Sequence, residues 1–156
     1  KIKLYYMKLQ VRKLQESDWE FLPLWWAAHG QIPWIDNEDF RDFLPGAFQL
    51  GDYEKKRAGL GGFMVCKGNY PIAAMWLGMS NTNAAVPTAT ISNPLYRDND
   101  RMKGIQLLVN FVTNFAKELG YKYSFGWAQK GKMLDYYLEA GYEKFQRPSY
   151  ELIKKL

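Results

Sequence analysis

One long amphipathic helix constrains the fold of this chain more than any other feature. Within residues 102–119, apolar side chains recur at alternating steps of three and four, which places them on one face of a helix. They are Ile105, Leu108, Val112, Phe115 and Leu119. Gly120 follows directly, at the position where a left-handed residue commonly ends a helix. The spacing therefore predicts a helix over residues 102–119 with a single buried face.

Short apolar runs on both sides of this helix predict β-strands. Some alternate with polar residues, which is the period of a half-buried strand. Gly68 and Asn69 separate two of the runs, and this dipeptide tolerates the positive φ of a hairpin turn. That pair should be antiparallel, and a third antiparallel strand is closed by Pro94. The predicted strands cover residues 9–12, 63–67, 72–79, 88–93 and 121–127, and residues 142–147 and 150–153 should form a closing hairpin.

Three shorter helices complete the predicted secondary structure. Ser17 and Glu20 have the spacing of a capping box before an apolar run of helical period. Asp36 or Asn37 could cap a second, shorter helix. The three helices are expected over residues 17–30, 37–44 and 132–140.

The composition predicts one globular domain. Of the 156 residues, 47% are hydrophobic and 24% are charged, which excludes a disordered tail and a charged coiled coil. No apolar run approaches the ~20 residues that span a bilayer, so no membrane association is expected. Cys66 is the only cysteine and no secretory signal is apparent, which favours the cytoplasm. Residues 7–156 are expected to form a single α/β (α+β) domain, and residues 1–6 an N-terminal extension, natural or artificial.

The net charge of +5 suits an anionic partner such as a nucleotide cofactor or a nucleic acid. The basic residues are scattered, and no recognised nucleic-acid motif is present, so nucleic acid is an unlikely partner. No Cys, His or carboxylate cluster has metal-ligand spacing, and no metal is expected.

The order of elements resembles the GNAT superfamily of N-acyltransferases. The resemblance runs from about residue 7 to residue 156 and is strongest between residues 88 and 142. It implies a mixed, mostly antiparallel central sheet flanked by helices. Because a long helix joins strands 88–93 and 121–127, these two should be parallel and should splay apart to leave a cleft. The resemblance also implies acetyl-CoA or another acyl-CoA as co-substrate, with a primary amine on a small molecule or peptide as acceptor.

The family's acyl-CoA motif, R/Q-x-x-G-x-G/A, has its counterpart at the start of the long helix. Arg101 and Gly104 agree with the motif, whereas Gln106 stands where the family has glycine or alanine. The unpaired N–H groups and positive dipole of a first helical turn suit a pyrophosphate. The expected cofactor-binding residues here are Arg101, Met102, Lys103, Gly104, Ile105 and Gln106. The alternative is that Asp100 is only an N-cap and Gly104 an incidental small residue.

The resemblance assigns a second cofactor segment to the end of the preceding strand. Ile91, Ser92 and Asn93 are expected to bind the pantetheine arm of the cofactor through their main chain. An edge strand with a polar end explains the same residues equally well.

Tyr137 matches the tyrosine that the family places four residues before a Gly-Phe or Gly-Tyr pair. It is expected to protonate the departing thiolate of coenzyme A, because a phenol with a pKa near 10 is protonated at neutral pH. The alternative is that Tyr136 and Tyr137 only pack a short helix.

Other site residues are less defined. Many relatives use a glutamate on a central strand as general base, but strands 72–79 and 88–93 contain no acidic residue. His29 lies where relatives place part of the acceptor site, and a helix cap is its other role. Tryptophans could line an acceptor pocket or belong to the core, namely Trp25, Trp26, Trp34 and Trp76.

The sequence thus predicts an N-acyltransferase that works by direct transfer in a ternary complex. The alternative is a catalytically inactive GNAT-like binding or structural domain. The oligomeric state is not determined by the sequence, and a homodimer is one option.

Overall fold

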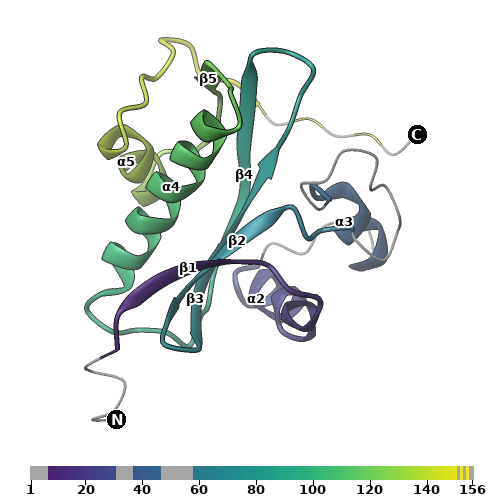
Figure 1. The fold of residues 1–156 in the computed structure, drawn as a ribbon, viewed down its shortest axis with the longest axis vertical. Helices are drawn as coiled ribbons and strands as arrows, with labels where there is room; N and C mark the ends of the chain where they lie inside the picture. The colour runs from purple at the N-terminus through teal and green to yellow at the C-terminus, as the bar shows by residue number, and fades with distance from the viewer. Residues whose placement is uncertain (1–6, 31–36, 47–57, 151, 153, 155–156) are drawn as a thin grey trace.

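The computed structural model describes residues 7–30, 37–46, 58–150, 152 and 154, which form a sheet with helices on both faces (Figure 1). The predicted extension, residues 1–6, lies outside the described residues. The strands are β1 (Leu9–Lys13), β2 (Gly62–Lys67), β3 (Tyr70–Gly78), β4 (Ala84–Ser92) and β5 (Tyr123–Ser124). The helices are the 3₁₀ helix η1 (Glu16–Glu20), α2 (Leu22–Ala28), α3 (Asn37–Phe43), α4 (Arg101–Glu118) and α5 (Lys132–Glu139).

The five strands form one mixed sheet in the order β1-β2-β3-β4-β5. The first four are antiparallel to their neighbours, and β5 is parallel to β4. Gly68, with φ +58°, makes the turn between β2 and β3, as the Gly68-Asn69 dipeptide predicts. The predicted α/β class with a mostly antiparallel sheet is confirmed.

Two hydrophobic clusters cover the two faces of the sheet. Along β2, Phe63 and Val65 belong to the cluster under α4 and α5, whereas Met64 and Cys66 belong to the cluster under α2. Figure 1 shows α4 and α5 on one side of the strands and α2 and α3 on the other. Because successive side chains of β2 point to opposite faces of the sheet, this strand contributes to both hydrophobic clusters.

The long helix α4 is present where its periodicity predicts it. Its buried residues are Gly104, Ile105, Leu108, Val109, Val112 and Ala116. Leu119, expected on the same face, is exposed because the helix ends at Glu118. Gly120 has φ +95°, and its N–H donates to the carbonyl of Lys117, so it ends the helix as predicted.

The first predicted helix is divided, and its cap is not the predicted one. The segment is a 3₁₀ helix followed by α2, and the two meet at Phe21. The Ser17–Glu20 capping box is wrong, because Asp18 accepts the main-chain N–H of Gln15 at 2.8 Å instead. Asp18 also forms an ion pair with Arg12 of β1, and no sequence pattern predicts this contact. The predicted cap Asp36 lies outside the described residues.

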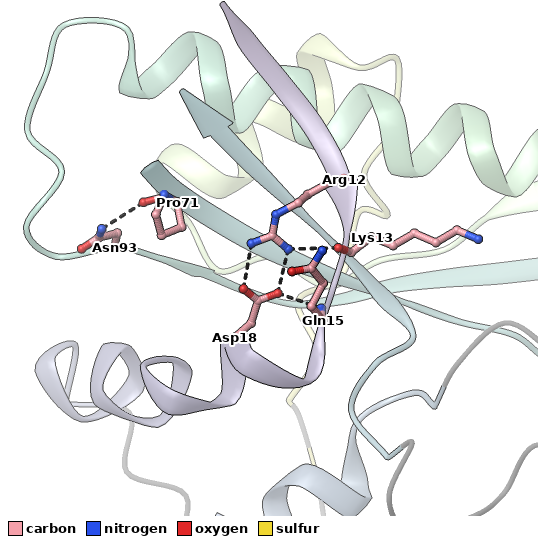
Figure 2. A network of polar contacts seen from close by, with 6 residues as sticks. All are labelled: Arg12, Lys13, Gln15, Asp18, Pro71 and Asn93. Carbon is pink, nitrogen blue, oxygen red and sulfur yellow. Dashed lines mark hydrogen bonds and ion pairs between the residues drawn. The ribbon is translucent and has the colours of Figure 1, made fainter. Parts of the chain in front are cut away.

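The Arg12–Asp18 ion pair joins β1 to η1 (Figure 2). The guanidinium donates two hydrogen bonds to the carboxylate, at 2.8 and 2.7 Å. The side chain of Asp18 is only 4% exposed, whereas that of Arg12 is 31% exposed. Hydrogen bonding to Asp18 raises the pKa of Arg12, and burial partly opposes this shift. The buried charge of Asp18 is therefore matched by one cation and one main-chain donor.

The predicted closing hairpin does not form within residues 142–150, which contain no strand. Phe145 and Tyr150 are 79% and 92% exposed. A hairpin at this edge needs a partner strand, but β5 pairs over only Tyr123–Ser124 rather than residues 121–127. Residues 151 and 153 of the prediction lie outside the described residues.

Candidate functional site

The strands β4 and β5 separate shortly after they meet. Ala84 pairs with Tyr123 and Ala85 with Ser124, in parallel. The N–H of Phe125 then donates to the carbonyl of Ala85 at 2.8 Å. Within residues 84–92 and 121–130, no further main-chain hydrogen bond joins the two segments. The prediction that these strands are parallel is confirmed, and their pairing is short, whereas the cleft between them stays a prediction.

The edge of β4 that faces this separation is irregular. Thr88 pairs with Trp76 and Ile91 with Ala74, so Ala89 and Thr90 together oppose Met75 in a β-bulge. Ala89 has φ +57° and is the one non-glycine residue of the described chain with positive φ. This conformation costs a residue other than glycine about 1–2 kcal/mol. Such strain often marks a functional site.

Pro87 lies on the same edge of β4, between the parallel pairs and the bulge. It is opposite Leu77, whose own N–H donates to Gly61 on the other side of β3. In an antiparallel ladder, the main-chain groups of Pro87 then point away from β3. The free edge therefore lacks an N–H at this position.

The first turn of α4 has two main-chain donors without partners. The N–H of Arg101 donates to Asp98 at 3.1 Å and that of Gly104 to Asp100 at 2.9 Å. The N–H groups of Met102 and Lys103 have no hydrogen bond within the part of the chain that the structure describes. Both residues are exposed. Together with the helix dipole, these two donors can bind an anion.

Asp100 precedes this turn, but its carboxylate does not cap the helix. One carboxylate oxygen accepts a hydrogen bond from Nζ of Lys67 at 2.5 Å. The other accepts a hydrogen bond from the hydroxyl of Tyr96, also at 2.5 Å. Burial alone would raise the pKa of Asp100, but the hydrogen bonds from Lys67 and Tyr96 outweigh it and lower the pKa below its usual value. Lys67 thus compensates the negative charge next to the anion-binding turn.

Ser92 connects three elements at the end of β4. Its hydroxyl accepts a hydrogen bond from Nη2 of Arg101 at 2.7 Å. Its carbonyl lies 2.9 Å from Nε2 of His29, at the end of α2, so that nitrogen carries the proton. Nε of Arg101 is buried without a hydrogen-bond partner. The guanidinium therefore keeps an unsatisfied donor beside the helix N-terminus.

The predicted pantetheine segment offers fewer free groups than expected. The N–H of Asn93 donates to Ile72 of β3 at 2.8 Å. By the alternation of an antiparallel ladder, Ile91 also directs its main-chain groups to β3. Ser92 is therefore the one residue of the three whose main chain faces the free edge of β4. Its carbonyl is occupied by His29, a contact that the sequence does not reveal.

The side chain of Gln106 bridges α4 and α5. Its Nε2 donates to Oδ1 of Asn110 and to the carbonyl of Tyr136, each at 3.1 Å. Gly104, two residues earlier, faces the sheet rather than the helix N-terminus. A Cβ on Gly104 would lie 3.4 Å from Cδ1 of Ile72. Here Gly104 allows α4 to pack closely on the sheet, and Ile105 is buried beside it.

Tyr137 points from α5 toward the segment that follows β5. Its ring contacts Tyr142, with 4.9 Å between centroids, and a Cβ on Gly126 would lie 3.1 Å from it. Only 5% of Tyr137 is exposed. Burial, with a smaller effect of Tyr142, raises the pKa of Tyr137 well above its usual value. The raised pKa keeps the phenol protonated at neutral pH, and its hydroxyl has no hydrogen bond to another described residue.

Tyr136 occupies the neighbouring position and is buried in the same hydrophobic cluster as Tyr137. Burial raises the pKa of Tyr136, and the positive charge of Arg101 acts in the opposite direction. The contact that distinguishes Tyr136 is the hydrogen bond that its carbonyl accepts from Gln106.

No protein-family model and no curated protein matches the sequence. A transcriptional regulator from Bacillus halodurans C-125 matches with a TM-score of 0.64 and 15% identity, over 94% of this chain and 100% of that one. Glucosamine-6-phosphate N-acetyltransferase from Arabidopsis thaliana has a TM-score of 0.61 and 12% identity, over 94% of this chain and 99% of that one. A predicted acetyltransferase from Clostridium acetobutylicum, solved with acetyl-CoA, has a TM-score of 0.60 and 18% identity, over 94% of this chain and 96% of that one.

The chain has the GNAT fold. Several other acetyltransferase structures match over the same 94% of the chain. In GNAT terms, the described structure brings the predicted cofactor residues Arg101, Met102 and Lys103 together with Ser92 at one end of β4. Tyr137 lies at the other end, near the segment after β5.

Three of the four tryptophans that could line an acceptor pocket belong to the core instead. Trp25, Trp26 and Trp76 are all buried, and the rings of Trp26 and Trp76 are 5.4 Å apart. Trp34 lies outside the described residues. Trp25, Trp26 and Trp76 therefore pack α2 against the sheet.

Other features of the described surface lie away from these residues. A shallow pocket of about 390 Å³ at the C-terminal end of α4, next to Lys117 and Tyr123, includes none of the predicted site residues. Among the described residues, no three His, Cys, Asp or Glu side chains are grouped as a metal site. No described helix has the length and apolar character needed to cross a membrane.

Proposed function

We propose that this protein is an N-acyltransferase that moves an acetyl or other acyl group from acyl-coenzyme A to a primary amine. The observation that supports it best is the position of the α4 N-terminus, with its two unpaired donors, at the end of a strand whose outer edge is unpaired beyond Ala85. The acetyltransferases among the matching structures, one of them solved with acetyl-CoA, support the same reaction class.

The cofactor would bind along β4 with its phosphates at α4. The N–H groups of Met102 and Lys103 would donate to pyrophosphate oxygens, and the side chains of Arg101 and Lys103 would add positive charge. The pairing of Asp100 with Lys67 reduces the repulsion that its carboxylate would otherwise exert on a phosphate. The pantetheine arm would use the free edge of β4 near Ser92 and Thr90.

The chemical step would be direct attack of the amine on the thioester. The nitrogen forms a bond to the acyl carbon and releases one proton to solvent water, the carbon–sulfur bond breaks, and the sulfur leaves as a thiolate. The hydroxyl of Tyr137 would give its proton to that thiolate. The acceptor is proposed to be a small molecule or a peptide amine, and the reaction is proposed to take place in the cytoplasm.

The direct test is calorimetric titration of the protein with coenzyme A and acetyl-CoA. A dissociation constant between about 1 μM and 1 mM is expected, the usual range for enzyme substrates. Saturable acetyl transfer to at least one member of a panel of primary amines is expected in the same preparation. Absence of any binding at millimolar cofactor would contradict the enzyme proposal and leave the binding-domain alternative.

Arg101→Ala is expected to weaken coenzyme A binding by about 1.5–3 kcal/mol, the range for a hydrogen bond to a charged group. Turnover at saturating cofactor should change less, because Arg101 lies at the phosphate end of the site. The measurement is the dissociation constant by calorimetry, together with kcat.

Two control variants separate the charge of Arg101 from its other roles. Lys117→Ala removes one positive charge from the opposite end of α4 and should leave the affinity nearly unchanged. Ser92→Ala removes the internal partner of the guanidinium. If Ser92→Ala weakens binding as much as Arg101→Ala does, Arg101 only braces β4 and the phosphate role is wrong.

A further inference from the structure

We propose that Gln106 is a latch that holds α5 against α4 in the ligand-free protein and thereby lowers the affinity for acyl-coenzyme A. The latch is the hydrogen bond from Gln106 of α4 to the carbonyl of Tyr136 in α5, and Asn110 accepts a second hydrogen bond from Gln106 within α4. This inference rests on the proposed function and adds a residue that limits cofactor binding.

The contacts of Gln106 satisfy both of its donors inside the protein. A side-chain amide has two N–H groups, and here one is directed to Asn110 and the other to Tyr136. The first bond stays within α4, whereas the second spans 30 residues and joins two helices. Gln106 is half-buried, so the bond to Tyr136 is partly shielded from water.

The latch lies between the two ends of the proposed site. The free N–H groups of Met102 and Lys103 are about one turn before Gln106 on the same helix. Tyr137, the proposed acid, directly follows Tyr136 on α5. The phenol of Tyr136 is itself close enough to Arg101 for the guanidinium to influence its pKa. The bridge is therefore about one turn from the free donors on α4 and one residue from Tyr137 on α5, so a ligand that uses both would lie beside it.

Cofactor binding then requires the Gln106–Tyr136 bond to break or to be exchanged. Alanine or glycine at this position has no side chain that could form the bridge. A partly buried hydrogen bond contributes enough to change a dissociation constant by about two- to tenfold. The free protein is stabilised by this bond and the complex is not, so the bond lowers the affinity.

The test is calorimetric titration of coenzyme A into four proteins: unmodified, Gln106→Ala, Gln106→Met and Asn110→Ala. Gln106→Met keeps most of the side-chain volume but removes both hydrogen bonds. Asn110→Ala removes the bond within α4 and leaves the bridge to Tyr136. Both Gln106 variants are expected to bind about two- to tenfold more tightly, and Asn110→Ala to bind like the unmodified protein.

Hydrogen exchange of the ligand-free proteins gives a second readout. The main-chain amides of α5 should exchange faster in both Gln106 variants than in the unmodified protein and Asn110→Ala. Unchanged exchange would contradict a latch.

The binding results distinguish this inference from the proposed function. If the unmodified protein binds coenzyme A and both Gln106 variants bind equally or more weakly, the latch is wrong. Weaker binding would in addition indicate that Gln106 contacts the cofactor. If only Gln106→Ala binds more tightly, side-chain volume and not hydrogen bonding limits affinity, which also overturns the latch. If no variant binds at millimolar coenzyme A, the proposed function fails and the inference fails with it.

Discussion

Tyr137→Phe is expected to lower the turnover number by about 10²–10⁴-fold, the usual contribution of one general acid. The ring stays in contact with Tyr142 and Gly126, so the fold and the coenzyme A affinity should be retained. Because burial raises the pKa of Tyr137, its proton remains bound throughout the neutral range and above the ordinary tyrosine pKa near 10. The kcat of the unmodified protein should therefore show no decline from ionisation of Tyr137 below about pH 10.

Tyr136→Phe is the matched control, because it removes the same atom from the adjacent residue. The phenol that packs against Gly126, after β5, is that of Tyr137, so kcat should change much less in Tyr136→Phe. Full activity of Tyr137→Phe would show that Tyr137 is not the acid. A large loss of kcat in Tyr136→Phe alone would transfer the role to Tyr136.

Arg12→Met is expected to lower the free energy of unfolding by roughly 3 kcal/mol, the low end of the range for breaking a buried ion pair. The variant leaves the carboxylate of Asp18 buried, with the N–H of Gln15 as its remaining donor among the contacts drawn in Figure 2. The measurement is urea unfolding followed by far-UV circular dichroism.

Two further variants test this explanation. Adding Asp18→Leu to Arg12→Met removes the unpaired charge and should restore much of the lost stability. Glu16→Gln disrupts the more exposed Arg41–Glu16 pair and should cost less than about 1 kcal/mol. If Arg12→Met unfolds no more easily than Glu16→Gln, the Arg12–Asp18 pair does not stabilise the fold.

The parts of the structure that the sequence predicts are those with local causes. The period of the apolar residues in α4 depends only on helix geometry, and Gly120 ends the helix through its own backbone freedom. The turn at Gly68 is equally local. The parallel pairing of β4 and β5 follows from the crossover through α4, which requires no knowledge of side-chain contacts.

The unpredicted parts depend on residues far apart in the chain. Lys67 and Asp100 are 33 residues apart, and Gln106 and Tyr136 are 30 apart. No periodicity connects such residues, so the compensation of Asp100 and the bridge to α5 could not be foreseen. The predicted Ser17–Glu20 cap is wrong for a more local reason, because Arg12, six residues before Asp18, pairs with the Asp18 carboxylate.

The proline and the bulge on β4 also affect how this protein meets other copies of itself. An unpaired strand edge is normally a template on which a second chain can add a strand and begin to aggregate. Between Ala85 and Ser92, Pro87 removes one donor from the edge, Ala89 twists the backbone out of register, and His29 occupies the last carbonyl. This edge can therefore stay open to a small ligand while remaining a poor template for strand addition.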